Sequence, residues 1–450
     1  MGDVTNRGTN NVMNSLPDGW GKDDSDHDDV VAAECVGGVE IRAIAEGEIA
    51  EWDRAFRLGF LRPHVGSAEE SWRLRYEPGR LLAAVDGGRH VATFRSFDVE
   101  LTVPGGATVQ ADAVTNVTVS ATHRRRGLLS RMMSRDLSAA RERGVPVAIL
   151  IAAEYNIYGR FGFGPATRGH GWNIDLHRTR GLREGLPTVP GGRIDFLTTE
   201  ELRKVGPELH DHWRLGQPGA IARDEFWWKL STGEITVPGF GDWKEPFAAL
   251  HRDAEGNATG LVVYRIDTSW DGSYPNSTLT VVDFLAHDRA TATALWRFVL
   301  SVDWVRTVVA ENIGPDDPLP LLLQDPRAAT PHVDNADFTW LRVLDVEAAF
   351  NARTYGAPGR IVLEVEDRDG YAAGRWAIET TADGTGHCAR TTDQADLALD
   401  ASALGTLYLG GETVPRLAAA SLVTELRPAA ATAADLLLRT PLLAWNPDSF

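Results

Sequence analysis

The sequence predicts an α+β protein with two successive strand–helix–strand units followed by a third α+β region. The first unit lies between residues 114 and 153, and the second lies between 279 and 310. This order of elements at this spacing is typical of a right-handed crossover that joins parallel neighbouring strands. The repeat indicates a duplicated domain, and a chain of 450 residues is long enough for two or three domains.

An amphipathic helix and an antiparallel meander precede the first crossover. From residue 49, apolar residues recur at three- and four-residue steps, which predicts a helix with one buried face. These residues are Ile49, Trp52, Phe56 and Phe60. Strand-like runs follow at 80–86, 90–103 and 107–119, separated by Gly and Pro turns. The crossover continues with a helix over 128–143 and a wholly apolar strand over 145–153.

The second unit and the third region complete the predicted order of domains. A strand over 279–285 leads to a helix around residues 294–300 and to a strand over 305–310. The segment 315–331 contains five prolines and is expected to be a linker, with packing of its PLPLLL core as the alternative. Short strands and Ala-rich helices then indicate an α+β region. The expected domains are residues 37–188, 189–335 and 336–450.

Residues 1–36 form an acidic tail. They are rich in Asp, Gly and Asn, and the run DDSDHDD occupies residues 23–29. Such a composition buries too little apolar surface to offset the entropy lost on ordering. The sequence therefore predicts that this tail is disordered.

The overall composition narrows the classes of function. A formal net charge of -18 disfavours nucleic acid as a partner and favours attraction of small cations. The two cysteines, Cys35 and Cys388, are too few for a disulfide framework or a usual zinc site, so we expect no metal. The chain has no basic and apolar leader and no apolar run of about 18 residues, so we expect a cytoplasmic protein without a membrane partner.

The join between the first crossover strand and its helix carries a basic motif, His123-Arg124-Arg125-Arg126-Gly127. A helix N-terminus offers unpaired N–H groups and the positive end of a dipole, which suits a phosphate group. Arginines add charge there, and a glycine lets the backbone approach the ligand closely. The alternative is a basic turn that is merely solvated, as charge runs usually are. The position at a strand-to-helix join favours an anion site.

This motif and a second one resemble a known family. GNAT acetyltransferases carry Arg/Gln-x-x-Gly-x-Gly/Ala at the corresponding join, and this chain matches the Arg and the first Gly but has Leu129 at the last position. Together with Ile157-Tyr158-Gly159-Arg160-Phe161-Gly162-Phe163-Gly164, the motif resembles the enhanced intracellular survival (Eis) family of acetyltransferases. That resemblance implies two tandem GNAT domains, each a mixed sheet with helices on both faces, and a C-terminal sterol-carrier-like domain.

The resemblance also implies an acetyl-CoA site in the first domain. The backbone of Val117, Thr118 and Val119 is expected to pair with the pantetheine arm like an added strand. The pyrophosphate is expected to bind the loop and first helical turn, namely Arg125, Arg126, Gly127, Leu128, Leu129 and Ser130. Ala153 and Glu154 are expected to flank the thioester. Without the resemblance, these two residues would be interpreted as an ordinary strand end.

The corresponding join of the second unit serves as an internal comparison. The sequence Leu285-Ala286-His287-Asp288-Arg289-Ala290-Thr291 has neither an arginine run nor a glycine. We therefore expect the central domain not to bind CoA. Its expected role is to shape the substrate pocket and the oligomer interface.

Acetylation of an amine requires a proton donor for the departing thiolate and a base for the amine. In the family context Tyr158 is the expected donor, whereas a tyrosine in such a turn is otherwise more often a packing residue. Tyr155 is the less favoured alternative. In the resembled family the base is the C-terminal carboxylate, here that of Phe450. The alternative is a tail that docks only for stability, because chain ends usually fray.

Two classes of function remain open at this point. The first is an N-acetyltransferase that moves acetyl from acetyl-CoA to cationic acceptors, either aminoglycoside-like polyamines or lysine amines. The second is a non-catalytic sensor or carrier that binds acyl-CoA or a lipid. By analogy alone, the resemblance further implies a homo-oligomer, namely a hexamer.

Overall fold

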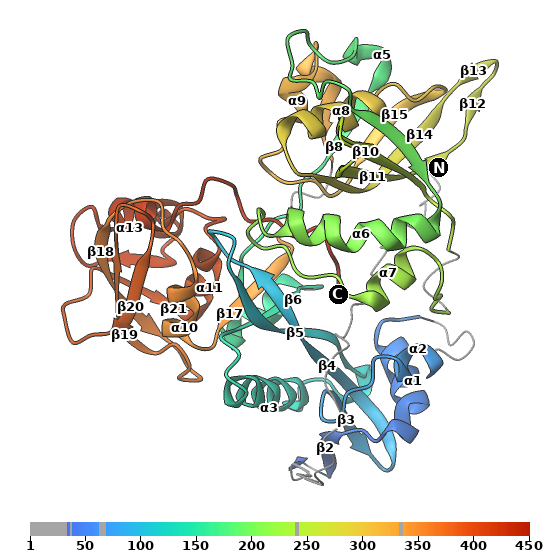
Figure 1. The fold of residues 1–450 in the computed structure, drawn as a ribbon. Coiled ribbons are helices and arrows are strands. Elements are labelled where there is room, and N and C mark those ends of the chain that lie inside the picture. Colours follow the sequence, from blue (N-terminus) through green and yellow to red (C-terminus); the bar gives the residue numbers. More distant parts are fainter. Residues whose placement is uncertain (1–33, 37, 63–68, 239–242, 333–335) are drawn as a thin grey trace.

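The computed structural model describes residues 34–36, 38–62, 69–238, 243–332 and 336–450. The described chain forms three bodies, with the C-terminal domain set to one side of the other two (Figure 1). Among the helices in these ranges, none is long and apolar enough to cross a membrane.

The first domain is built on an eight-stranded sheet. Its strand order is β1-β2-β3-β4-β5-β6-β17-β7. The bounds are β1 (Glu34–Val36), β2 (Val39–Ala43), β3 (Leu81–Asp86), β4 (Arg89–Thr102), β5 (Thr108–Val119), β6 (Val147–Ile151), β17 (Thr339–Val343) and β7 (Gly164–Pro165). Neighbouring strands are antiparallel except β5 and β6, which are parallel. The predicted meander and crossover are therefore confirmed.

Helices cover both faces of this sheet (Figure 1). The short η1 (Glu46–Glu48), α1 (Ile49–Gly59) and α2 (Glu69–Arg73) lie on one face, where Trp52 of α1 meets the edge of Trp72 at 5.0 Å between ring centroids. The crossover helix α3 (Leu128–Glu142) covers the other face and buries Met132, Met133 and Leu137. The apolar residues that recur at three- and four-residue steps in α1 and α3 thus face the sheet, as the sequence predicts.

The central domain repeats this plan with a seven-stranded sheet. Its order is β16-β8-β15-β14-β11-β10-β9. The bounds are β16 (Ala329–Pro331), β8 (Trp172–Asp175), β15 (Val305–Ala310), β14 (Ser277–Ala286), β11 (Ala258–Asp267), β10 (Phe247–Arg252) and β9 (Arg193–Leu197), with a small hairpin of β12 (Trp270–Asp271) and β13 (Tyr274–Pro275). Strands β14 and β15 are parallel and are joined by α8 (Arg289–Val299). Helices α6 (Thr199–Arg214) and α7 (Glu225–Ser231) pack on the opposite face.

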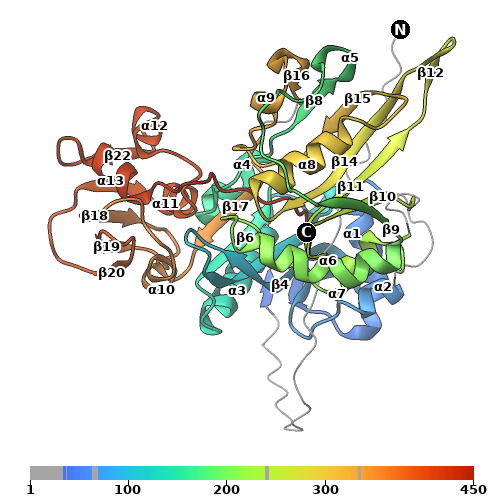
Figure 2. The same ribbon diagram turned by 45° about the horizontal axis from the view of Figure 1, so that its top comes forward.

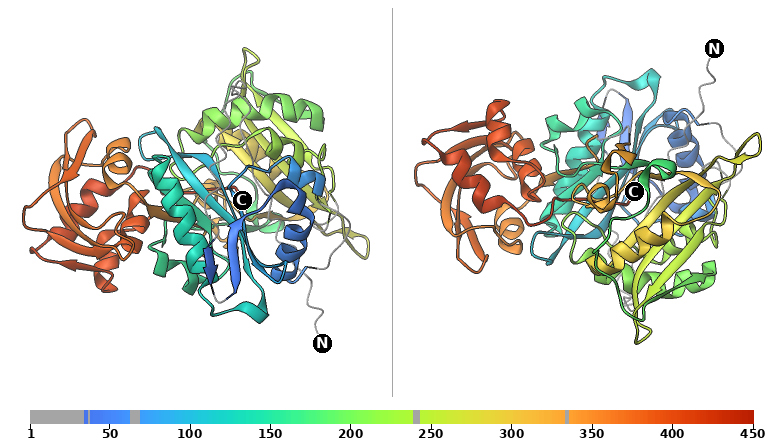
Figure 3. Two further views of the ribbon diagram at one scale, coloured as in Figure 1. Left: turned by 90° about the horizontal axis from the view of Figure 1, so that it is seen from below. Right: turned by 90° about the horizontal axis from the view of Figure 1, so that it is seen from above.

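The C-terminal domain is a five-stranded sheet with helices against it (Figure 2). The strand order is β20-β19-β18-β21-β22. The bounds are β18 (Gly359–Glu366), β19 (Gly374–Thr380), β20 (Gly386–Arg390), β21 (Leu397–Asp400), β22 (Val423–Glu425), α10 (Val346–Ala352), α11 (Ala401–Tyr408), α12 (Val414–Ala419) and α13 (Ala430–Leu438). After α13 the chain leaves this domain and ends between the other two (Figure 3).

Several predicted boundaries differ from the structure. Strand β8, expected in the first domain, lies in the central sheet, and β17, expected in the C-terminal domain, lies in the first sheet. The Pro-rich segment is not an open linker, because it forms α9 (Leu319–Leu322), η4 (Pro326–Ala328) and β16, and Leu319 and Leu322 are in the central core. Residues Glu34–Val36 of the expected tail pair with β2, whereas residues 1–33 lie outside the described residues. Each strand joins a sheet through hydrogen bonds to distant sequence, which local patterns do not encode.

Candidate active site

The crossover strands of the first domain separate toward their ends. Parallel pairing between β5 and β6 covers Ala111–Val114 and Val147–Leu150, so Val117, Thr118 and Val119 extend beyond it. A bulge marks the change, because Asn116 has a left-handed backbone with φ of 53°. The Thr93 hydroxyl donates to the Asn116 carbonyl at 2.8 Å and stabilises the bulge. The inner edge of this β5 segment can therefore pair with an extended ligand.

The loop after β5 forms a concave turn onto the N-terminus of α3. Arg125 and Gly127 both have left-handed backbone conformations, with φ of 63° and 78°. A Cβ added at Gly127 would have no neighbour within 4 Å, so this glycine serves the backbone conformation and the space in front of the helix. The helix has no side-chain cap, and its first internal bond is donated by Arg131 to Gly127. The N–H groups of Leu128, Leu129 and Ser130 thus face the loop without an intrahelical acceptor.

His123 braces the same loop. Its Nε2 lies 2.9 Å from Oδ2 of Asp86, and its Nδ1 lies 2.7 Å from the Thr122 hydroxyl. The hydrogen bond with His123 is the main cause of the lowered pKa of Asp86. His123 therefore connects the loop to the end of β3 rather than facing a ligand directly.

The helix after β6 carries the two tyrosines. β6 ends at Ile151, so Ala153 and Glu154 lie in the exposed turn beyond the strand, and Glu154 precedes the first turn of α4 (Tyr155–Tyr158). Tyr158 is buried, and burial, followed by the charge of Glu154, raises its pKa to about 12. Tyr155 is 60% exposed and rests edge-on against Trp340.

The C-terminal segment docks against the first and central domains. Its backbone and side chains bond to residues of the central domain, since Trp445 donates through its backbone to Pro218 at 2.8 Å and through its ring to Asn312 at 2.9 Å. Phe450 is 9% exposed, and its ring meets the edge of Phe97 on β4 at 6.0 Å between centroids. The Phe450 side chain therefore packs against the first sheet.

A buried ionic clamp fixes this segment two residues before its end. Nε of Arg223 donates to both carboxylate oxygens of Asp448 at 3.0 Å. Its Nη1 and Nη2 donate to Asp283 at 2.6 and 3.1 Å, and its guanidinium stacks 3.9 Å from the centroid of Trp227. Burial would lower the pKa of Arg223, but the two carboxylates outweigh it and the pKa is raised. The Arg223 guanidinium is thus charged, and the clamp joins the central domain to the C-terminal segment.

The predicted catalytic pair does not meet directly. Tyr158 packs with Phe163 in the core beneath α3, whereas Phe450 packs with Phe97 in the core on the other face of the sheet. Among the described residues, no hydrogen bond, ion pair or ring contact joins the two, and they belong to different core clusters. Any joint action on one substrate would span the region where β5 and β6 separate.

The central domain has the same splayed strands but a different helix start. Pairing of β14 with β15 ends at Val281, five residues before the end of β14. Asp288 caps α8, and its side chain accepts from the N–H of Thr291 at 2.8 Å. A carboxylate at this position satisfies the helix N-terminus and repels a phosphate. This geometry supports the expectation that the central domain does not bind CoA.

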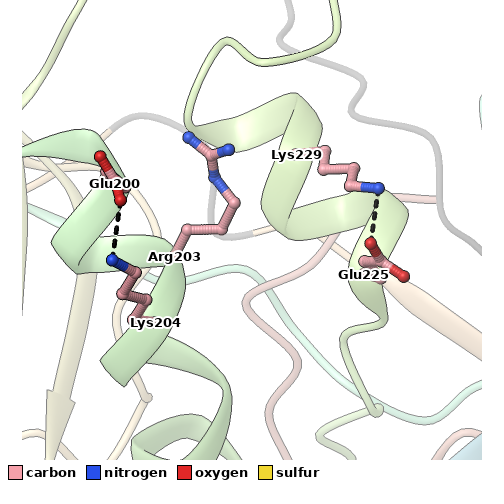
Figure 4. A pocket seen from close by; sticks show the side chains of 5 residues that line it. All are labelled: Glu200, Arg203, Lys204, Glu225 and Lys229. Carbon is pink, nitrogen blue, oxygen red and sulfur yellow. Dashed lines mark hydrogen bonds and ion pairs between the residues drawn. The ribbon is translucent and has the colours of Figure 1, made fainter.

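A surface cleft between α6 and α7 is lined by charged side chains (Figure 4). Glu200 pairs with Lys204 at 2.7 Å, and Glu225 pairs with Lys229 at 2.5 Å. The remaining lining side chain, Arg203, pairs with Glu234. The charged side chains that line this cleft are therefore already paired with one another or with Glu234. The cleft lies between α6 and α7 and not at the loop before α3.

Three parts of the chain match known domain families. Residues 40–166 and 219–343 each match an acetyltransferase (GNAT) domain, and residues 346–446 match a sterol carrier protein domain. The splayed parallel strands and the uncapped helix start lie within the first match. The fold and site define an acetyltransferase with two GNAT domains and a sterol-carrier-like domain.

The relatives narrow this class to one family. The chain is 49% identical over 417 residues to an uncharacterized N-acetyltransferase of Streptomyces avermitilis, covering 92% of this chain and 99% of that protein. It is 35% identical over 386 residues to the N-acetyltransferase Eis of Mycobacterium tuberculosis, covering 82% and 90%. The crystal structure of Eis1 from Mycobacterium abscessus matches with a TM-score of 0.79 and 32% identity, covering 91% and 100%. The chain belongs to the Eis family of N-acetyltransferases.

The sequence did not reveal the residues of the clamp. Arg223 and Asp283 lie far from both motifs, and no local pattern distinguishes them from other charged residues. Asp448 lies near the chain end, where a carboxylate is usually solvated, so the sequence did not predict that its side chain is buried in an ion pair. Their role emerges only when the three domains are assembled.

Proposed function

We propose that the protein transfers the acetyl group of acetyl-CoA to an amino group of a cationic acceptor. The acceptors considered are aminoglycoside-like polyamines and lysine amines. The observation that supports the proposal is the buried clamp, which fixes Asp448 two residues before Phe450, together with the packing of the Phe450 ring on Phe97 of the sheet that bears the loop before α3.

The acetyl donor is proposed to lie along β5 and the start of α3. The backbone of Val117, Thr118 and Val119 would pair with the pantetheine arm. The pyrophosphate would accept hydrogen bonds from the loop and the first turn, with charge supplied by Arg125 and Arg126. The remaining groups of this cradle are Gly127, Leu128, Leu129 and Ser130, and Ala153 and Glu154 would border the thioester.

Tyr158 is proposed to assist departure of the CoA sulfur. With its pKa raised to about 12, the phenol stays protonated at neutral pH. It can therefore donate a hydrogen bond to the thiolate that forms as the C–S bond breaks. The exposed Tyr155 rests edge-on against Trp340 and is assigned no such role.

Phe450 is proposed to act through its main-chain carboxylate as the general base. An α-carboxylate has an ordinary pKa of about 3.5, so it is ionised at neutral pH and can accept the proton that the amine loses as its nitrogen bonds to the acetyl carbon. The clamp and the contact with Phe97 restrict its position. A formal net charge of -18 supports attraction of a cationic acceptor.

The alternative of a lipid-binding carrier receives less support from the C-terminal domain. Arg353 is buried there and donates to the carbonyls of Leu438 at 2.6 Å and Thr354 at 3.1 Å, as well as to Tyr408. A charged side chain in the interior is a poor lining for an apolar ligand.

We further propose a cytoplasmic homohexamer, and sedimentation that finds only monomer at micromolar concentration would contradict that assembly.

A thiol-release assay with acetyl-CoA and a panel of amines tests the proposal. We expect turnover with at least one cationic amine and a large loss of turnover when residues are added after Phe450, because the extension replaces the free carboxylate with an amide. Acetyl-CoA affinity and the melting temperature serve as controls for folding. Retained acetyl-CoA binding without turnover on any amine would instead support the carrier.

A further inference from the structure

Arg75, which follows α2, is a buried cation without a hydrogen-bond partner. Its side chain is 2% exposed, and none of its three guanidinium nitrogens reaches a hydrogen-bond acceptor among the described residues. One face of the guanidinium lies 4.3 Å from the ring centroid of Phe226 in the central domain. Buried guanidinium groups are normally hydrogen-bonded, because leaving their donors unsatisfied is costly.

A second buried arginine lies close to it. Arg95 on β4 is 1% exposed, and its guanidinium lies 4.6 Å from the ring centroid of Phe97. Burial and the charge of Arg95 hold the pKa of Arg75 well below its ordinary value, while Asp224 partly opposes this effect. The carboxylates near this pair are Asp224, which caps α7 through the N–H of Trp227 at 2.8 Å, and Glu77. Two guanidinium groups are thus buried close to each other.

The arginine pair lies on the face of the sheet that receives the C-terminus. Thr93, Arg95 and Phe97 alternate along β4 and therefore share one face. Thr93 bonds the bulge at Asn116, and Phe97 contacts the ring of Phe450. Arg95 therefore lies between the point where β5 leaves β6 and the proposed base. This is the face on which an acceptor would approach Phe450.

We propose that Arg75 and Arg95 form an anion-binding subsite that takes a carboxylate of the acceptor. This inference rests on the proposed function and narrows it, because the acceptor would carry an amine and a carboxylate, as a free diamino acid does and an aminoglycoside does not. A guanidinium presents a planar fork of donors that matches a carboxylate in a bidentate geometry. The bound carboxylate would satisfy the donors of Arg75 and leave the amine directed toward Phe450.

Matched acceptors test the subsite. L-Lysine and cadaverine differ by the α-carboxylate, as do L-ornithine and putrescine, and we expect wild-type kcat/KM to favour the amino acid of each pair by on the order of tenfold to a hundredfold. Arg75→Met should remove that preference while leaving acetyl-CoA affinity and the rate with the diamines unchanged. Equal use of both members of every pair by the wild type, or a preference retained in Arg75→Met, would overturn the subsite.

Stability measurements separate a binding role from a structural one. Since the Arg75 side chain has no hydrogen-bond partner in the described part of the chain, Arg75→Met should leave the melting temperature unchanged or raise it. The matched control is Arg353→Met, which removes a buried arginine with four carbonyl partners and should lower the melting temperature without altering acceptor preference. A fall in melting temperature for Arg75→Met equal to that of the control would mean a structural role and would overturn the proposal.

A binding experiment remains decisive if the enzyme turns over no amine. With CoA present, Nε-acetyl-L-lysine should bind more tightly than N-acetylcadaverine to the wild type, and the two should bind equally to Arg75→Met. Inorganic phosphate serves as a competitor, and displacement by phosphate but not by acetate would assign the pair to a phosphorylated ligand and overturn the carboxylate proposal. Absence of turnover would therefore refute the proposed function, whereas equal binding of the two products would refute the subsite.

Discussion

The clamp on the C-terminal segment leads to a quantitative prediction for Asp448→Asn. The substitution keeps the volume of the side chain but removes the charge that Arg223 contacts at 2.9 to 3.0 Å. Loss of one partner of a buried ion pair costs about 3–5 kcal/mol, and a hydrogen bond to a charged group is worth about 1.5–3 kcal/mol. Arg223 keeps its second carboxylate, Asp283, and Asn retains one acceptor. We therefore expect a loss of about 2 kcal/mol in docking of the segment.

That loss should appear mainly in kcat. If docking of the segment is only marginally favourable, about 2 kcal/mol corresponds to a fall in kcat of up to roughly 30-fold, because each 1.4 kcal/mol is a factor of ten. Acetyl-CoA affinity should stay unchanged, since the loop before α3 does not contact Asp448. The thiol-release assay gives kcat, and calorimetry gives the affinity for acetyl-CoA.

A second buried pair supplies the matched control. Nη2 of Arg342 donates to both carboxylate oxygens of Asp367 at 2.7 Å, far along the chain from the C-terminus. Asp367→Asn should lower stability to a similar extent but leave kcat near the wild-type value at temperatures where the variant is folded. Wild-type kcat in Asp448→Asn, or an equal loss of kcat in both variants, would refute the positioning role of the clamp.

Three further predictions concern the first domain. Replacing Arg125 and Arg126 with Ala should weaken acetyl-CoA binding by about 1.5–3 kcal/mol for each lost contact, with one site per chain in calorimetry; unchanged affinity would remove the phosphate cradle. Tyr158→Phe should bind acetyl-CoA normally and lose most turnover, whereas Tyr155→Phe should be close to neutral; a wild-type rate in Tyr158→Phe would mean that the donor is misassigned. Because burial raises the pKa of Tyr158 from 10.0 to about 12, its contribution to stability is fully present below pH 10 and is lost as pH rises toward 12. Thermal melts should therefore show a shallower loss over this range for Tyr158→Phe, and equal slopes for the two proteins would contradict the shift.

The sequence by itself determined the elements and the chemistry of the phosphate loop. The repeated strand–helix–strand order indicated a duplicated domain, since hydrophobic periodicity is a local property that can be recognised without knowledge of contacts. The two motifs then carried the resemblance that implied GNAT domains. The loop around Gly127 was also evident, because its backbone geometry and charge depend on consecutive residues. The sequence also predicted that the second unit lacks such a loop, because the segment around Asp288 has neither an arginine run nor a glycine. In the structure, the Asp288 side chain caps the helix instead.

Only the tertiary structure decided which strands complete each sheet and which residues surround the C-terminus. Strands β8 and β17 each lie in the sheet of a different domain from the one expected. The hydrogen-bonding groups at the edge of a sheet can pair with any strand that the assembled fold places there. The clamp of Arg223, Asp283 and Asp448 joins segments separated by 60 and 225 residues. The Arg75 guanidinium is covered on one face by Phe226 of α7, which belongs to the central domain. Burial and long-range pairing give these side chains their roles, and both are properties of the assembled fold and not of any local stretch of sequence.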